Sequence, residues 1–216
     1  MSMGSTQRFT FTLRKLGLLK HVRGTKLYEL SPRMLDFSYQ YIAGHSLATR
    51  AIPYLQQLSV ETEETVNLTV LDETDIVFMQ RIVSRHVLTP EVTVGTRLPA
   101  YCTSSGLAVL AALPEEQSDN ILQASHRVAH TQHTITGLDE IRQRLEEIRT
   151  RGYAHTEDEL YLGDISTAVA VVGADGHPLG AINIAIARPR WEGPEHEARI
   201  AALLITAARA ISSRNI

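Results

Sequence analysis

Two pairs of short apolar runs, each pair joined by a tight turn, constrain the fold of this chain more than any other feature. The first pair covers residues 65–72 (TVNLTVLD) and 75–83 (DIVFMQRIV), and the second covers residues 167–174 (TAVAVVGA) and 179–187 (LGAINIAIA). Strands joined by a turn of a few residues pair with each other and run in opposite directions. The chain is therefore expected to contain a largely antiparallel sheet.

Helical segments surround these strands. Residues 91–98 (EVTVGTRL) indicate a further strand, and the helices are expected at residues 46–64, 102–113, 114–125, 137–152 and 194–214. Strand pairs set among helices are typical of the α+β class. Residues 46–216 have a normal length for one domain, and we predict that they form one.

The first 28 residues differ from the rest in charge. They contain six Lys or Arg and no Asp or Glu, whereas the whole chain of 216 residues has 21 basic and 24 acidic side chains. A basic end on an acidic body is typical of a segment that binds a polyanion, and nucleic acid is the first candidate. The sequence shows neither a signal peptide nor a membrane span, so we expect a cytoplasmic protein without a membrane partner.

The basic front predicts half of a DNA-binding domain. Residues 6–16 have the spacing of an amphipathic helix, and the runs at 18–22 and 26–30 predict a two-stranded hairpin. A helix followed by a basic hairpin is the second half of a winged helix-turn-helix, here a partial one in residues 1–30. The alternative is a basic surface helix that stays solvated. The side chains expected at DNA are Ser5, Thr6, Gln7, Arg8, Thr10, Arg14, Arg23 and Lys26.

Residues 31–45 predict a linker helix that also dimerises. Ser31 is a good N-cap, and Pro32 suits the first helical turn. The segment has apolar side chains on more than one side, at Met34, Leu35, Phe37, Tyr39 and Ile42. Such a surface is expected to bury itself against another helix or chain, which predicts a homodimer, with a tetramer as a further step. The alternative is packing on its own domain.

Five segments occur in an order that resembles the IclR family of bacterial transcriptional regulators. They are LRKLGLLKH, KLYELSPRMLDFSYQYI, GTRLPAYCTSSGLAVLAAL, GYAHTEDELYLGDIS and DGHPLGAINIAIARP. The RLPAYCTSSG and AINIA segments are most similar to the branch that senses aromatic or other small carboxylic acids. The resemblance implies a winged helix-turn-helix, a linker helix and a GAF-like effector-binding domain in a dimeric or tetrameric, ligand-responsive transcription factor. Its partners would be operator DNA and a small carboxylate, with no cofactor.

The start of the chain departs from this family. Members have roughly two helices before the recognition helix of the winged helix-turn-helix, and only residues 1–4 precede Ser5 here. Those helices would bury the apolar stripe of Phe9, Leu13 and Leu16. We therefore expect a weakly held half-domain and impaired DNA binding by the chain as given.

An anion site is expected at the start of the helix that follows Cys102. Free backbone N–H groups and the helix dipole favour anions there, Thr103, Ser104 and Ser105 supply hydroxyls, and Gly106 would allow close approach of a ligand. The alternative is plain helix capping by these hydroxyls.

Polar residues within the apolar strands complete the predicted site. Ser166 and Asn183 interrupt or flank apolar runs, which indicates defined hydrogen-bond partners. The resemblance implies that they contact the ligand together with Thr156, often Asp in the family, and Ala185, often Ser. Apolar walls are expected from Leu98, Tyr101 and Ile182.

Other reactive residues favour binding over catalysis. Cys102 could be a nucleophile before a helix N-terminus, but the sequence places no base beside it, so an inert buried thiol is preferred. His126, His130 and His133 have the spacing of one helical face, yet they lie in a polar stretch, and solvated loop histidines are preferred over metal ligands. We predict no catalytic residue and no metal site. The competing function is a stand-alone GAF-like small-molecule binder or enzyme without DNA contact.

Overall fold

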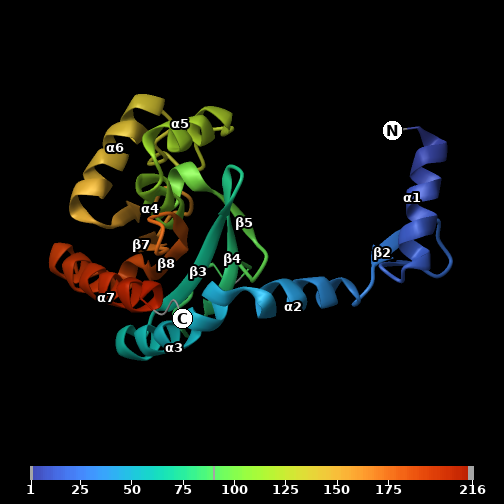
Figure 1. Cartoon of the computed structure of the whole chain (residues 1–216), viewed down its shortest axis with the longest axis horizontal. Helices are drawn as coiled ribbons and strands as arrows, with labels where there is room; N and C mark the ends of the chain where they lie inside the picture. Colours follow the sequence, from blue (N-terminus) through green and yellow to red (C-terminus); the bar gives the residue numbers. More distant parts are fainter. Residues whose placement is uncertain (1, 90, 214–216) are drawn as a thin grey trace. The chain divides into compact units, whose positions relative to one another are not determined.

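The computed structural model describes residues 2–89 and 91–213. The chain divides into two compact units (Figure 1): unit 1 is Met1–Ser46, and unit 2 is Leu47–Ile216. Unit 1 corresponds to the basic front and the predicted linker helix, and unit 2 corresponds to the predicted effector domain.

Unit 1 consists of two helices with a hairpin between them. Helix α1 (Met3–Lys15) is followed by the antiparallel strands β1 (Leu19–His21) and β2 (Tyr28–Leu30), and then by α2 (Met34–Gly44). Helix α1 begins earlier than predicted because the Ser2 hydroxyl caps it, accepting from the Ser5 N–H at 3.2 Å. The helix–hairpin order expected for the partial winged helix-turn-helix is present.

The Ser31 hydroxyl caps the turn that leads into α2, as predicted, because it accepts from the Arg33 N–H at 3.2 Å. The same hydroxyl donates to the Gly17 carbonyl at 2.5 Å, and the Arg33 guanidinium donates to the Leu16 carbonyl at 2.8 Å. Gly17 has the left-handed φ of +76° that ends a helix at a glycine. These two bonds satisfy carbonyls at the end of α1, so the polar groups before α2 hold unit 1 together.

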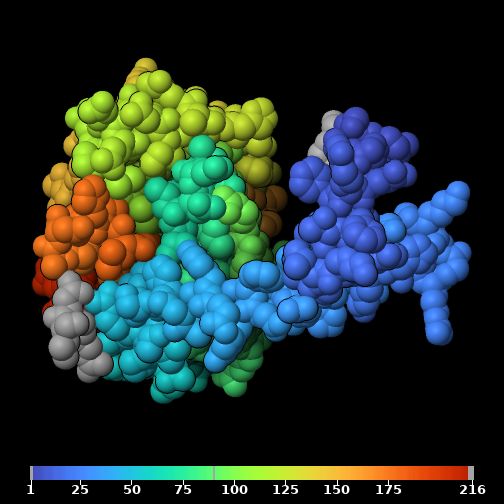
Figure 2. Space-filling view, turned by 45° about the vertical axis from the view of Figure 1, so that its right-hand side comes forward, coloured from blue at the N-terminus to red at the C-terminus, as the bar shows by residue number. Residues whose placement is uncertain are grey.

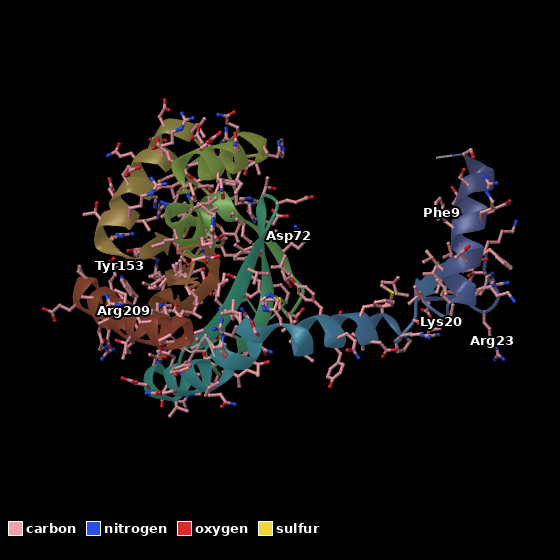
Figure 3. All side chains as sticks on the ribbon, viewed as in Figure 1. Phe9, Lys20, Arg23, Asp72, Tyr153 and Arg209 are labelled. Carbon is pink, nitrogen blue, oxygen red and sulfur yellow. The ribbon has the colours of Figure 1, made fainter. Side chains whose placement is uncertain are left out.

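Apolar side chains of unit 1 remain on its surface, which Figure 2 draws in blue. Phe9 on α1 and Leu16 at its C-cap are 61% and 54% exposed, and Phe9 stands away from the ribbon in Figure 3. On α2, Leu35, Phe37, Tyr39 and Tyr41 are all more than half exposed. The stripe of α1 that sequence analysis expected to need a partner is therefore uncovered in this chain.

Unit 2 is built on a six-stranded antiparallel sheet with the order β5-β4-β3-β8-β7-β6. The two predicted hairpins are β3–β4 and β7–β8, and β3 pairs with β8 to join them into one sheet. This arrangement confirms the expected α+β class. The strands are β3 (Thr65–Asp72), β4 (Asp75–Ile82), β5 (Arg97–Pro99), β6 (Ala154–Glu157), β7 (Asp164–Val172) and β8 (Pro178–Ala187).

Helices lie on both faces of this sheet (Figure 1). Helices α4 (Ser104–Ala112) and α6 (Leu138–Arg151) contribute to a core that includes Phe78 and Ala181 of the sheet, with α5 (Glu115–Ala124) beside them. Helices α3 (Ser46–Thr62) and α7 (Pro194–Ser212) lie on the opposite side. Two single turns, η1 (Ala100–Cys102) and η2 (Arg188–Arg190), connect strands to helices.

The predicted strand at 91–98 is largely wrong. Only Arg97–Pro99 forms a strand, because Gly95 takes a left-handed φ of +88° and the Thr93 N–H bonds to the Thr96 hydroxyl within a turn. Strand β6 was missed because its sequence, AHTE, is short and half polar. It is held by pairing with β7, a contact that local sequence does not reveal.

Candidate functional site

Strand register brings polar residues from distant parts of the chain into two neighbouring rows. Asn67 on β3 lies opposite both Arg81 on β4 and Asn183 on β8. In the next row, Ser166 on β7 lies opposite Thr156 on β6 and Ala185 on β8. These six residues line a cavity with an empty volume of about 520 Å³, part of it open to solvent. The start of α4 adds Thr103, Ser104 and Ser105 to its wall.

A chain of buried hydrogen bonds joins α4 to the sheet inside this cavity. The hydroxyl oxygens of Ser104 and Ser166 are 2.7 Å apart, and the Asn183 amide nitrogen donates to the Ser166 hydroxyl at 2.8 Å. All three side chains are at least nine-tenths buried. Buried polar groups without partners are rare, yet the Asn183 amide oxygen has no hydrogen-bond partner among the described residues. We call Ser104, Ser166 and Asn183 the triad.

The capping alternative applies to Thr103 and not to Ser104. The Thr103 hydroxyl accepts from the Gly106 N–H at 3.3 Å and donates to the Pro99 carbonyl at 2.9 Å, so it is the N-cap of α4. Ser104 instead bonds across to Ser166. The Gly106 N–H therefore already has a hydrogen-bond partner, the Thr103 hydroxyl, within the protein.

Gly106 has a different role from the predicted one. A Cβ atom at this position would lie 2.2 Å from the Ala100 carbonyl oxygen and 2.3 Å from the Ala100 Cα. The close approach is therefore that of the η1 backbone, and Gly106 is not among the residues that line the cavity. The glycine is required for packing α4 on η1.

Two other predicted wall residues also lie elsewhere. Ile182 is adjacent to Asn183 on β8, and neighbouring side chains on a strand point to opposite faces; Ile182 is fully buried outside the cavity lining. The Tyr101 hydroxyl donates to the Val128 carbonyl at 2.6 Å and accepts from the Val128 N–H at 3.0 Å, which holds a loop in place. Leu98 does line the cavity, as expected.

Charged residues that sequence analysis missed stand in the same cavity. Arg81 donates to the Asn67 side-chain oxygen at 3.1 Å and to the Thr89 carbonyl at 2.9 Å, while its Nε atom has no hydrogen-bond partner among the described residues. Burial lowers the pKa of Arg81, and nearby Asp164 opposes this effect. Burial raises the pKa of Asp164 to about 6. The signal in the sequence was an arginine at the end of an otherwise apolar strand.

The loop between β6 and β7 forms one wall of the cavity through Glu159, Leu160 and Tyr161. Glu159 is 6% exposed and pairs with Arg144 at 2.7 Å. Burial raises the pKa of Glu159, and Arg144 counteracts this shift.

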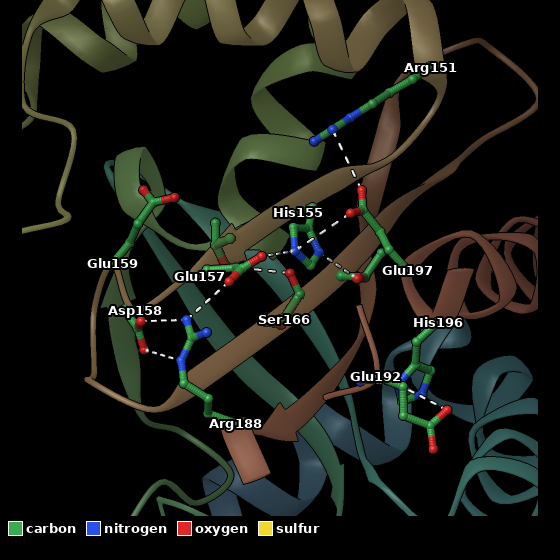
Figure 4. A network of polar contacts seen from close by, with 12 residues as sticks. Arg151, His155, Glu157, Asp158, Glu159, Ser166, Arg188, Glu192, His196 and Glu197 are labelled. Atoms are coloured by element: carbon green, nitrogen blue, oxygen red, sulfur yellow. Dashed lines mark hydrogen bonds and ion pairs between the residues drawn. The ribbon is translucent and has the colours of Figure 1, made fainter. Parts of the chain in front are cut away.

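Ion pairs hold this loop at its base (Figure 4). Arg188 contacts Glu157 at 3.0 Å and also pairs with Asp158, and the Asp158 carboxylate accepts from the Gly163 N–H at 2.6 Å. The first and last residues of the loop are thereby tied together, which holds its cavity-lining side chains in place.

Reactive side chains near the cavity lack the environment for catalysis. Cys102 lines the cavity, but burial raises the pKa of its thiol to about 12, so the nucleophilic thiolate is disfavoured. His126, His130 and His133 lie exposed in the loop after α5 and share no helical face. These positions agree with the preferred interpretations of an inert thiol and of solvated histidines.

The predicted DNA-contacting residues lie on α1 and on the hairpin of unit 1. Gln7, Arg8 and Arg14 are exposed, and Lys20 and Arg23 project from the hairpin (Figure 3). The Thr6 and Thr10 hydroxyls donate to carbonyls one turn earlier in α1, at 3.1 and 2.9 Å. Ser5 lies in the first turn of α1, and Lys26 precedes β2.

Comparison with known proteins decides the family. Residues 39–213 match the family model of the bacterial transcriptional regulator IclR C-terminal domain. The chain belongs to the IclR family. The Pca regulon regulatory protein of Pseudomonas putida is 30% identical over 206 residues, which are 95% of this chain and 70% of that protein. The relatives of this IclR-family chain are named as transcriptional regulators and not as enzymes.

Solved structures agree with this assignment. The Thermotoga maritima IclR structure has the same fold, with a TM-score of 0.81 and 23% identity over 98% of this chain and 85% of that chain. A double mutant of the PobR inducer-binding domain from Acinetobacter, in complex with 3-hydroxybenzoic acid, is 27% identical with a TM-score of 0.69, covering 74% of this chain and 94% of that one. This IclR-family regulator is thus a ligand-responsive transcriptional regulator. Among its described residues, no helix is both long and apolar enough to cross a membrane.

Proposed function

We propose that the cavity of unit 2 binds a small carboxylate, aromatic or short-chain, as the effector of this regulator. The observation that carries the proposal is the Arg81 guanidinium in this cavity, whose Nε–H has no partner among the described residues, together with the hydroxyl groups of the triad. Charge-assisted hydrogen bonds from the guanidinium are strongest in a desolvated cavity, which favours a small polar anion there even though the Asp164 and Glu159 carboxyl groups share the lining. The PobR inducer-binding domain, solved in complex with 3-hydroxybenzoic acid, adds support.

The test is calorimetry on the 216-residue chain with a panel of aromatic and short-chain acids. Asn183→Leu removes the polar group at constant size and should weaken the best ligand by about 1–3 kcal/mol, or roughly 5- to 150-fold. Asn120→Leu, on the exposed face of α5, is the matched control and should leave affinity unchanged. Equal affinity of the parent chain, Asn183→Leu and Ser166→Ala for the best ligand would place the effector elsewhere.

We further propose that unit 1 contacts operator DNA through Ser5, Thr6, Gln7, Arg8, Thr10, Arg14, Arg23 and Lys26, in a dimer or tetramer. Exposed basic side chains on a helix and a hairpin can contact phosphates, while the exposed polar side chain of Gln7 can reach bases. The Thr6 and Thr10 hydroxyls remain able to accept hydrogen bonds. A regulator of this kind acts where the DNA is, in the cytoplasm.

A further inference from the structure

Strand β7 has an open outer edge over Val169–Val172. On that side, β6 pairs with Ile165–Ala168 and reaches no further along β7. Strand β6 begins only at Ala154, because α6 ends just before it at Gly152, which takes a left-handed φ of +83°. On the inner side, Val169–Val172 pair with β8. One edge of the sheet is therefore uncovered beyond the start of β6.

Two residues of this edge present backbone hydrogen-bonding groups outward. The Asp158 N–H donates to the Asp164 carbonyl at 2.8 Å, so the backbone of Asp164 faces the β6 side. Residues of an antiparallel strand face its two neighbours alternately, and this alternation turns the N–H and C=O groups of Ala170 and Val172 outward. None of these groups has a hydrogen-bond partner among the described residues. An unpaired edge without charged residues or proline is a template for another strand.

Grooves flank this edge on both faces of the sheet. One groove, with an empty volume of about 550 Å³, lies between β7 and helices α4 and α6, and the other, of about 1290 Å³, lies between β7, the end of α6 and α7. Both grooves are lined by Val169, Ala170 and Val172, and small residues such as Ala111 and Ala208 belong to their helical walls. Side chains of a strand alternate between the two faces of its sheet. A strand added to β7 therefore has room for its side chains on both faces.

The charges around the two grooves are positive. Arg149, Arg151 and Arg209 belong to the lining, and no Asp or Glu does among the described residues. Arg149 pairs with Glu146, and Arg151 lies 3.8 Å from Glu197 (Figure 4). Arg209 is exposed on α7 and has no ion pair among the described residues. A partner with acidic residues therefore complements this surface.

A second copy of the chain fits this edge poorly. Antiparallel pairing of two copies over Val169–Val172 would set the residues after Val172 of one copy opposite Ile165–Ala168 of the other, where β6 already lies. Those residues form the turn of the β7–β8 hairpin, in which the Gly173 N–H donates to the His177 carbonyl at 2.7 Å. The edge instead fits a single extended segment that ends or leaves the sheet where it meets β6.

We propose that the open edge of β7 is a docking site for an extended apolar segment of another protein, with acidic residues at the N-terminal end of that segment. The segment runs antiparallel to β7, in line with β6, and bonds to the backbone of Ala170 and Val172. Its acidic end lies beside Arg209 at the far end of β7. This placement follows from α7, because Glu197 near the start of that helix lies 3.8 Å from His155 of β6, and Arg209 lies about 18 Å further along the helix.

The experiment is calorimetry on the 216-residue chain with the peptide acetyl-Glu-Glu-Val-Thr-Val-Thr-amide. A peptide with Lys-Lys in place of Glu-Glu should bind more weakly by roughly fivefold or more. Two further peptides are N-methylated, one at both Val residues and the other at both Thr residues. Only one of these alternate sets of amides can face β7. One methylated peptide should therefore lose binding, and the other should keep most of it.

Variants of the chain test the same contacts from the protein side. Arg209→Gln should weaken the Glu-Glu peptide by about 2- to 5-fold and leave the Lys-Lys peptide no weaker. Arg199→Gln, at an exposed arginine near the other end of α7, is the matched control and should change neither. Ala170→Pro removes one outward N–H and no bond to β8, so it should weaken the Glu-Glu peptide by about 2- to 10-fold.

Each contrary outcome overturns a stated part of the proposal. Equal binding of the two methylated peptides would overturn strand addition, and this comparison holds even if Ala170→Pro fails to fold. Equal binding of the Glu-Glu and Lys-Lys peptides would overturn the acidic partner. If no peptide binds the parent chain at millimolar concentration and Ala170→Pro dissociates an assembly of the parent chain in light scattering, the edge belongs to a second copy and the proposed partner is wrong. No peptide binding and no change in assembly would show that the edge is not a docking site.

Discussion

Replacing Gly106 with alanine tests whether this glycine serves packing or ligand access. The new Cβ would lie 2.2 Å from the Ala100 oxygen and 2.3 Å from the Ala100 Cα, whereas non-bonded carbon atoms prefer about 3.5–4.0 Å. Helix α4 or η1 must therefore move by roughly 1 Å or more. Both are buried: Ala100, Tyr101 and Leu107 are at most 1% exposed.

The energy of this displacement can be estimated from two opposing effects. Overpacking in a buried core costs about 1–3 kcal/mol, and a clash with backbone belongs at the upper end. Alanine in a helix is favoured over glycine by about 1 kcal/mol. The net expectation is a loss of about 2 kcal/mol or more in the free energy of unfolding.

Urea unfolding followed by tryptophan fluorescence measures this loss in unit 2 alone. The chain has a single tryptophan, Trp191, and its ring stacks between those of His155 and His196, each at a centroid distance of 5.2 Å. Its emission should therefore report unfolding of unit 2. Gly44→Ala in α2, where a Cβ meets no atom within 4 Å, is the control and should leave this transition in place. An unchanged or higher midpoint for Gly106→Ala would refute the packing argument.

Three further predictions concern pH, DNA and assembly. Burial raises the pKa of Asp164 to about 6 in the folded state, so between pH 4 and pH 6 the folded state holds a proton that the unfolded state has lost. Unit 2 should therefore lose stability as pH rises from about 4 through about 6, by at most about 3 kcal/mol. Urea unfolding at pH 4 and pH 7 should show a much smaller change for Asp164→Asn than for the parent chain, and an identical pH dependence would contradict the assignment. The chain should bind DNA weakly, and the logarithm of its binding constant should fall with the logarithm of salt concentration with a slope no steeper than about −5, because its front has six basic residues. Nanomolar binding to one operator at physiological salt in a fluorescence anisotropy titration would contradict this prediction. The exposed aromatic residues of α2 predict a dimer in light scattering at micromolar concentration, which Phe37→Glu together with Tyr39→Glu should dissociate; a monomeric parent chain would disprove the role of α2.

Local sequence was sufficient wherever one segment determines its own conformation. The β3–β4 and β7–β8 hairpins were predicted because a tight turn brings its two flanking runs side by side, and the start of α4 was predicted from a hydroxyl before an apolar run. The apolar stripe on α1 followed from its helical spacing. Ser166 and Asn183 were identified as site residues because polar side chains in apolar strands need partners, and Ser104 because it lies at the start of a helix. The structure brings these three together.

Tertiary structure decided which other residues share the cavity with them. Arg81 and Asp164 lie in the cavity because β3 pairs with both β4 and β8, and because β7 pairs with β8. The pairing of β3 with β8 joins segments that are 100 or more residues apart in the sequence. Ile182 was misplaced although alternation along β8 already sets it opposite Asn183. Gly106 was misplaced because its neighbour, Ala100, is brought close only by the turn of η1. The sequence alone thus determined the fold class, the family and the polar residues that need partners. The composition and charge of the cavity depend on which strands lie side by side, since side chains meet across a sheet and not along the chain.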